Sequence, residues 1–179
     1  MDLHALAVPT FVQMLKGLSA QLTKGEALVA EEGSAAHDLL GARLAPDMFP
    51  LSTQVRYACT QASELLRYLT GAEPFAPTQD AADFDGLRAQ LSDAIVRLEA
   101  TPAAALEGVA TREISVTLPN GIVFDVTGEQ FVRDWALPQF YFHLGMAYAI
   151  LRHKGVALGK PDWVSHMFAY IRPGSLPGG

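Results

Sequence analysis

Residues Trp135–Gly155 read WALPQFYFHLGMAYAILRHKG, and this stretch decides the fold because it is almost wholly apolar at helical spacing. Its Phe, Tyr, Leu, Met and Ile side chains cover every direction of a helix. A helix that is apolar all round lies at the centre of a protein or is shared between subunits. His143 stands in its middle, so this ring is either a buried structural hydrogen bonder or the remainder of a metal site.

Three earlier stretches predict amphipathic helices. Apolar residues recur at helical spacing over residues 11–29, 51–69 and 84–98. We expect Pro9 in the first turn of the first helix, Gly33 at its end and Gly71 as the cap of the second. A linker rich in proline and acidic residues, 73–83, separates the second helix from the third.

A β-hairpin is predicted before the last helix, because the apolar period changes to two on either side of Pro119-Asn120-Gly121. Thr127 and Gln130 then have the spacing of a capping box, which starts the last helix. Pro138 removes a backbone hydrogen bond inside it. We therefore expect a kink or a break near Leu137 before the helix continues through His153.

These elements predict an all-α fold, a four-helix bundle with a small β-hairpin inserted before the last long helix. Residues 1–172 form a single domain in this interpretation, and residues 173–179 form a disordered Pro/Gly tail. The apolar last helix, or a neighbouring one, is the expected contact of a homodimer.

Composition and charge argue against several classes of function. The net charge of −6, with basic residues scattered singly, argues against nucleic-acid binding. The longest apolar stretch falls short of the roughly 20 residues of a membrane span, so no membrane association is expected. The first residues lack the pattern of a signal peptide, and the single cysteine rules out an internal disulfide. A cytoplasmic location is predicted.

The sequence contains no complete set of catalytic residues of a recognisable type. Cys59 falls on the apolar stripe of the second helix and is expected to be a packed thiol. Neither a Gly-x-Ser-x-Gly motif nor a phosphate-binding glycine loop is present.

Several motifs resemble an uncharacterised bacterial family, the domain of unknown function DUF1993. They are VPTFVQMLK at 8–16, LAPDMFPL at 44–51, FYFH at 140–143, AILRH at 149–153 and GVALGK at 155–160. That family is similar to the DinB/YfiT-like superfamily of metalloenzymes. The resemblance implies an up-down-down-up four-helix bundle that is often dimeric. Some superfamily members are divalent-metal-dependent thiol transferases or hydrolases.

The resemblance also implies a metal site of three histidines, one from the second helix and two spaced four apart on the last long helix. His143 matches the first of that pair, but Ala147 stands four residues further on, and residues 50–69 hold no histidine. His153 is about 15 Å further along the same helix axis and cannot bind the same ion.

Other residues of the second helix region are candidates to face His143. Asp47 and Gln54 are the nearest oxygen donors, and Tyr57 and Ala147 would line a pocket with Gln54. One His with Asp47 would bind a metal weakly and favour oxygen-preferring ions. In the structural interpretation, His143 instead donates to a backbone carbonyl or to Asp47 and specifies helix packing.

Two function classes follow. In the first, the protein is a dimeric bundle, non-catalytic or with a degenerate metal site, that binds a small ligand or a partner near His143 and needs no cofactor. In the second, it is a thiol transferase or hydrolase that uses a divalent metal (Ni, Zn or Mn). There His143 is a ligand and Asp47 is a ligand or general base.

Overall fold

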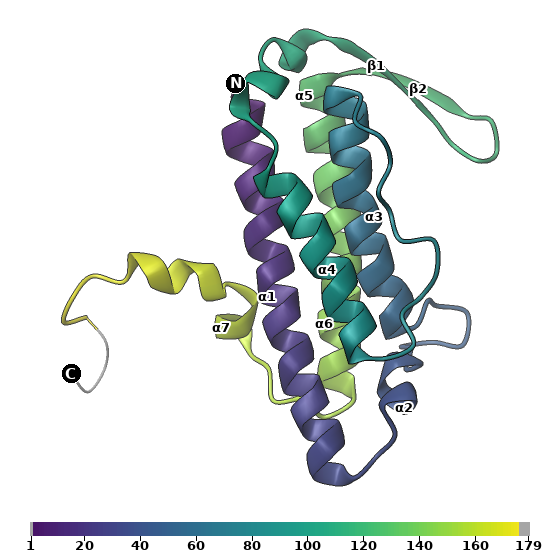
Figure 1. Cartoon of the computed structure of the whole chain (residues 1–179), viewed down its shortest axis with the longest axis vertical. Coiled ribbons are helices and arrows are strands. Elements are labelled where there is room, and N and C mark those ends of the chain that lie inside the picture. The colour runs from purple at the N-terminus through teal and green to yellow at the C-terminus, as the bar shows by residue number, and fades with distance from the viewer. Residues whose placement is uncertain (1, 176–179) are drawn as a thin grey trace.

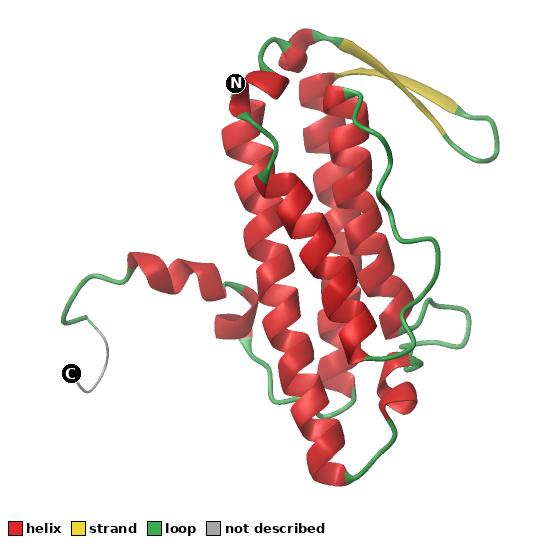
Figure 2. Cartoon of the chain, viewed as in Figure 1, coloured by secondary structure: helices red, strands yellow, loops and turns green. Residues whose placement is uncertain are grey.

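The computed structural model describes residues 2–175, which are mostly helical (Figures 1 and 2). The longest helices are α1 (Leu3–Glu32), α3 (Leu51–Thr70), α4 (Phe84–Glu99) and α6 (Leu137–His153). Shorter helical segments are α2 (Ala36–Leu40), η1 (Ala103–Leu106), η2 (Val109–Thr111), α5 (Gly128–Gln130), η3 (Phe131–Ala136), α7 (Lys160–Trp163) and η4 (Ser165–Tyr170). The prediction of a helical protein with one hairpin is confirmed. The short segments bring the helical elements above the four predicted, because single turns carry too few residues to show a period.

The long helices pack lengthwise as a bundle, in which α1 and α3 each contact both α4 and α6. α3 and α4 run in one direction and α1 and α6 in the other, since the linker after α3 leads back along the bundle before α4 begins (Figure 1). At one end, the His4 ring nitrogen Nε2 lies 2.9 Å from the Thr101 carbonyl oxygen and joins the start of α1 to the end of α4.

The hydrophobic core lies between the long helices, and α6 contributes its centre. The rings of Phe11 and Phe140 stack with centroids 3.9 Å apart, and both side chains are fully buried. Leu15, Val55 and Leu91 extend this core into α1, α3 and α4. Burying a side chain of this size contributes about 2 kcal/mol to the free energy of unfolding.

The start of α1 corrects one prediction. The helix begins at Leu3, where the Asp2 side chain accepts a hydrogen bond from the Ala5 backbone N–H, so Pro9 lies inside the helix and not in its first turn. A buried apolar face extends through Leu3 and Val8, and its burial offsets the backbone hydrogen bond that proline removes. The predicted end is confirmed, because Gly33 adopts the left-handed conformation with φ of 64°.

The irregularity expected near Leu137 is a π-helical turn, η3, and not a break. The Leu137 backbone N–H donates to the Val132 carbonyl, five residues back. Pro138 has no N–H, and its ring would press on the carbonyl of Asp134 in a regular α-helix. The wider turn accommodates this ring, and regular helix follows from Leu137 to His153.

The predicted hairpin is confirmed as β1 (Glu113–Thr117) paired antiparallel with β2 (Val123–Thr127). Gly121 in its turn has φ of 85°, a conformation that L side chains rarely adopt. The capping box is also formed, since the Thr127 hydroxyl accepts from the Gln130 N–H and the Gln130 side chain accepts from the Thr127 N–H. The hairpin stands at one end of the bundle (Figure 2).

In residues 2–175, none of the helices combines the length and apolar character that crossing a membrane requires. The first three residues of the predicted disordered tail form a turn, in which the Ser175 N–H donates to the Arg172 carbonyl over 3.1 Å. Residues 176–179 of that predicted tail lie outside the described part of the chain.

Candidate functional site

His143 projects from α6 toward α3, where it meets Gln54. The exposed fraction is 7% for His143 and 1% for Gln54, and His143 Nδ1 lies 2.9 Å from Gln54 Oε1. The Gln54 amide nitrogen donates to the Phe49 carbonyl over 3.3 Å, which orients its oxygen toward the histidine. His143 Nδ1 therefore donates, and in the neutral ring Nε2 carries the free lone pair.

Aromatic rings surround this pair. The Tyr57 ring stacks on the His143 ring with centroids 5.0 Å apart and an interplanar angle of 17°. Phe142 meets the His143 ring edge-on at 5.4 Å, and Phe49 lies 5.2 Å from Tyr57. Gln54 and Tyr57 are three residues apart and so share the α3 face that meets α6. Phe49 and Phe142 are about half exposed and form the outer rim of the site.

Burial, and then the positive charge of Arg56, lower the pKa of His143 to about 4. The ring is therefore neutral at pH 7. The Arg56 guanidinium lies 4.5 Å from the Tyr57 ring centroid, which places a cation against the aromatic layer.

Asp80, in the linker between α3 and α4, fixes Arg56 in this position. Arg56 Nε donates to one Asp80 carboxylate oxygen over 2.6 Å, and the Thr53 hydroxyl donates to the other. Partial burial acts to raise the pKa of Asp80, but the hydrogen bonds from Thr53 and Arg56 lower it below its ordinary value. Sequence reasoning missed this contact, because nothing in the linker composition shows which acid folds back onto α3.

The donor set does not fit a tight transition-metal site. The Nδ1 atom of His143 is engaged by Gln54, and Ala147, one turn further along α6, is buried and offers no donor. Within residues 2–175, no three His, Cys, Asp or Glu side chains are grouped so as to hold an ion. A tight site needs three or four protein ligands, so these residues do not fit one.

Asp47 and Gln54 were both expected as oxygen partners of His143, and the structure places Gln54 beside the ring. Asp47 is exposed and forms no hydrogen bond or ion pair with His143 in the described chain. The reason is geometric: Asp47 precedes α3 in an exposed loop, whereas Gln54 is one turn inside the helix on the face toward α6.

Three further side chains with reactive groups lie apart from this site. Cys59 is buried in the core, and burial raises the pKa of its thiol to about 12, so it is unreactive at neutral pH. His37 is exposed and pairs with its neighbour Asp38 over 2.9 Å. His153 is exposed in the last turn of α6, which is the end of the helix where the dipole attracts positive charge.

The fold defines a class, a helical bundle of the DinB type, because a solved member of that family shares it. A crystal structure of a DinB family member protein from Shewanella denitrificans is similar with a TM-score of 0.81 and 34% sequence identity. The match covers 98% of this chain and 96% of that one. The model of the family "Domain of unknown function (DUF1993)" matches residues 3–164, and the chain belongs to this family. No curated protein matches the chain.

Proposed function

We propose that this chain is a non-catalytic DinB-like four-helix bundle, with a degenerate metal site, that binds a small molecule at the rim of the His143 site. The observation that carries the proposal is the hydrogen bond of 2.9 Å between His143 Nδ1 and Gln54 Oε1. It holds the neutral ring in one tautomer, so that Nε2 is an acceptor of fixed position.

The chemistry of the surroundings indicates what such a ligand contains. Nε2 accepts a hydrogen bond, so the ligand carries a hydroxyl or amine donor. Phe49 and Phe142 flank the site with half-exposed rings, which favour an aromatic or otherwise apolar body. Phenol is the simplest probe that has both parts, and toluene is the matched probe that lacks the donor.

The test is a titration of the protein with each probe, followed by nuclear magnetic resonance of the His143 ring. We expect phenol to bind about five-fold more tightly than toluene, the effect of one hydrogen bond, and His143→Leu to abolish that difference. Phe168→Ala, which removes an exposed ring far along the chain, is the control. Equal affinity of the wild type and His143→Leu for phenol would refute the proposal.

Elemental analysis separates this function from the metal-dependent alternative. In protein purified without chelator, we expect Ni, Zn and Mn far below one equivalent per chain, and we expect His143→Ala to change the stability and leave the metal content unchanged. A nearly stoichiometric ion that is lost in His143→Ala would instead support a metal-dependent thiol transferase or hydrolase.

We further propose that the protein acts as a homodimer in the cytoplasm. Half-exposed aromatic side chains on α6 and near the C-terminus support the assembly. Sedimentation at micromolar concentration tests it, and a monomer would contradict it.

A further inference from the structure

Arg56 is a charged side chain beside the His143 site that the proposed ligand contacts leave unused. Its guanidinium carbon lies 4.5 Å from the centroid of the Tyr57 ring, and the Tyr57 centroid lies 5.0 Å from that of the His143 ring. The cation and the imidazole therefore contact the same tyrosine ring. The charge also reaches the imidazole, since after burial it is the second cause of the low pKa of His143. A ligand at Nε2 would lie in the same field.

Two contacts fix the position of this cation. Arg56 Nε donates to an Asp80 carboxylate oxygen over 2.6 Å, and the Thr53 hydroxyl donates to the other oxygen. The Arg56 side chain is 20% exposed, so water screens it less than a surface charge. Asp80 does not cancel the cation at the imidazole, because the charge that acts on the pKa of His143 is that of Arg56. The site therefore combines a fixed positive charge with a hydrogen-bond acceptor.

This combination distinguishes one donor group from another. When a hydroxyl donates to Nε2, its oxygen becomes more negative, and a nearby cation stabilises that charge. His143 is buried, so the electrostatic effect is stronger there than in water. A more acidic hydroxyl places more charge on its oxygen and gains more from the cation. The His143 ring, with a pKa of about 4, is too weak a base to remove the proton from a phenol, so the hydroxyl keeps it.

We propose that Arg56 determines the specificity of this site, and that it selects ligands with an acidic hydroxyl, such as an electron-poor phenol. This inference rests on the proposed function, because it needs a ligand that donates to His143 Nε2. It also names the chemical class of that ligand more closely. A carboxylate is disfavoured, since it has no proton to donate and its lone pairs would face the lone pair of Nε2.

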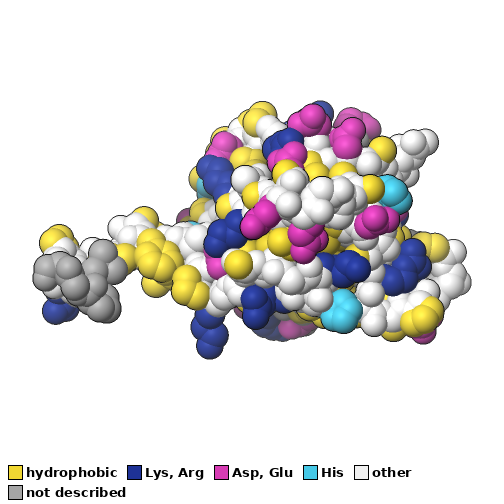
Figure 3. All heavy atoms as spheres, turned by 90° about the horizontal axis from the view of Figure 1, so that it is seen from below, with side chains coloured by type: hydrophobic (Ala, Val, Ile, Leu, Met, Phe, Trp, Pro, Cys, Tyr) yellow, Lys and Arg dark blue, Asp and Glu magenta, His cyan; other side chains and the backbone are white. Residues whose placement is uncertain are grey.

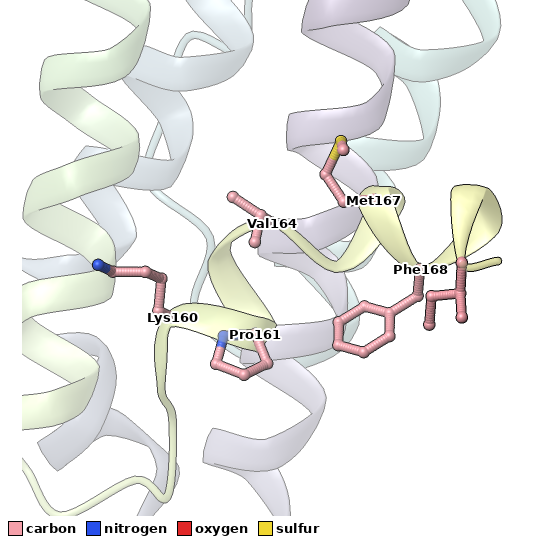
Figure 4. Close-up of a pocket in the computed structure, with 6 residues that line it drawn as sticks. Lys160, Pro161, Val164, Met167 and Phe168 are labelled. Atoms are coloured by element: carbon pink, nitrogen blue, oxygen red, sulfur yellow. The ribbon is translucent and has the colours of Figure 1, made fainter. Parts of the chain in front are cut away.

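A second hollow that small aromatic molecules fit lies elsewhere and is apolar. It is a groove of about 340 Å³ beside α7, lined by Lys160, Pro161, Val164, Met167, Phe168 and Ile171 (Figure 4). Apolar side chains gather on the projecting segment that carries it (Figure 3). Its walls are almost all apolar, so a hydroxyl adds little to binding there. Affinity for the proposed site is therefore read from the nuclear magnetic resonance signals of the His143 ring.

The contribution of the hydroxyl is measured with two matched pairs of probes. Phenol is paired with toluene, and 4-cyanophenol with 4-methylbenzonitrile, so that a methyl group replaces the hydroxyl in each pair. At about pH 6 both phenols keep their protons and His143 is neutral. In the wild type, we expect the hydroxyl to raise the affinity about five-fold for phenol and about fifteen-fold for the more acidic 4-cyanophenol.

Substitutions of Arg56 test whether its charge causes that difference. In Arg56→Gln we expect the hydroxyl to add about five-fold in both pairs, whereas Arg56→Lys keeps the charge and should retain the larger gain for 4-cyanophenol. Arg67→Gln is the matched control, because the Arg67 guanidinium lies over the Tyr68 ring of the same helix at 4.0 Å. It should leave both gains unchanged. Circular dichroism checks that each variant folds.

The other outcomes separate this inference from the proposed function. Equal gains for the two phenols in the wild type, both lost in His143→Leu, overturn the role of Arg56 and leave the proposed function standing. A larger gain for 4-cyanophenol that persists in Arg56→Gln does the same. Phenol affinity that is unchanged in His143→Leu overturns both. Benzoate that binds more tightly than 4-cyanophenol, and weakens in Arg56→Gln, would assign the site to an anion and overturn the selection of a hydroxyl donor.

Discussion

The two sides of α6 pack by different means. Toward α1, Phe140 stacks on Phe11 in a wholly apolar contact that is inaccessible to water. Toward α3, His143 is almost as buried, but it is held by one hydrogen bond to Gln54 and by the Tyr57 ring. Apolar contacts are less directional than hydrogen bonds, so the first side restricts the register of α6 less than the polar layer, which fits only one register of α6 against α3.

Removing the apolar contact should have the largest effect. Phe140→Ala leaves a cavity at the centre of the bundle and should lower the free energy of unfolding by about 4 kcal/mol. Phe142→Ala is the matched control, because the same residue type on the same helix is half exposed there, and it should cost less than about 1 kcal/mol. Urea unfolding followed by circular dichroism measures both. Similar losses in the two variants would show that burial does not distinguish the two rings.

Lowering the pH should weaken the contact between His143 and α3 and leave the apolar contact between α6 and α1 unchanged. An unfolded histidine has a pKa of about 6.5, and the folded pKa of His143 is about 4. Between these values the unfolded chain binds a proton that the folded chain does not, so the stability present above pH 6.5 is lost as the pH falls toward 4. The loss attributable to His143 should be about 3 kcal/mol.

His143→Leu isolates that loss. The variant has no imidazole to protonate, so its free energy of unfolding should fall less steeply than that of the wild type between pH 6.5 and 4. The difference between the two curves, measured in urea at each pH, is the contribution of the ring. Parallel curves would mean that His143 takes up its proton equally well in the folded chain.

Local sequence signals predicted the elements well. The Pro119-Asn120-Gly121 turn, the Thr127 to Gln130 capping box and the ends at Gly33 and Gly71 are confirmed, because each depends on the conformation of a few adjacent residues. Pro9 was placed wrongly, since burial of residues before it extends the helix backward. That extension depends on the other helices and not on residues near the proline.

The candidate site was predictable only in part. Helical spacing placed Gln54 and Tyr57 opposite His143, and the structure brings these three together. Asp47 was weighed equally, because a sequence does not show how an interhelical loop turns its side chains. Asp80 lies 24 residues from Arg56 in a linker without regular structure, so its contact arises from the path of the chain.

The smallest expected change in the free energy of unfolding concerns the linker between α3 and α4, residues 71–83. Asp80→Asn removes the charge that pairs with Arg56 and should lower the free energy of unfolding by about 0.5 kcal/mol, since the pair is partly exposed. Glu64→Gln is the matched control, because it breaks an ion pair with Arg67 inside a single helix. Both variants should unfold at nearly the same urea concentration, yet only Asp80→Asn should speed proteolytic cutting of residues 71–83. The reason is that Asp80 ties this linker to Thr53 and Arg56 of α3, whereas the partner of Glu64 lies within α3 itself. Equal cutting in the two variants would mean that the linker is held by its other contacts, and that Asp80 positions Arg56 without securing the chain around it.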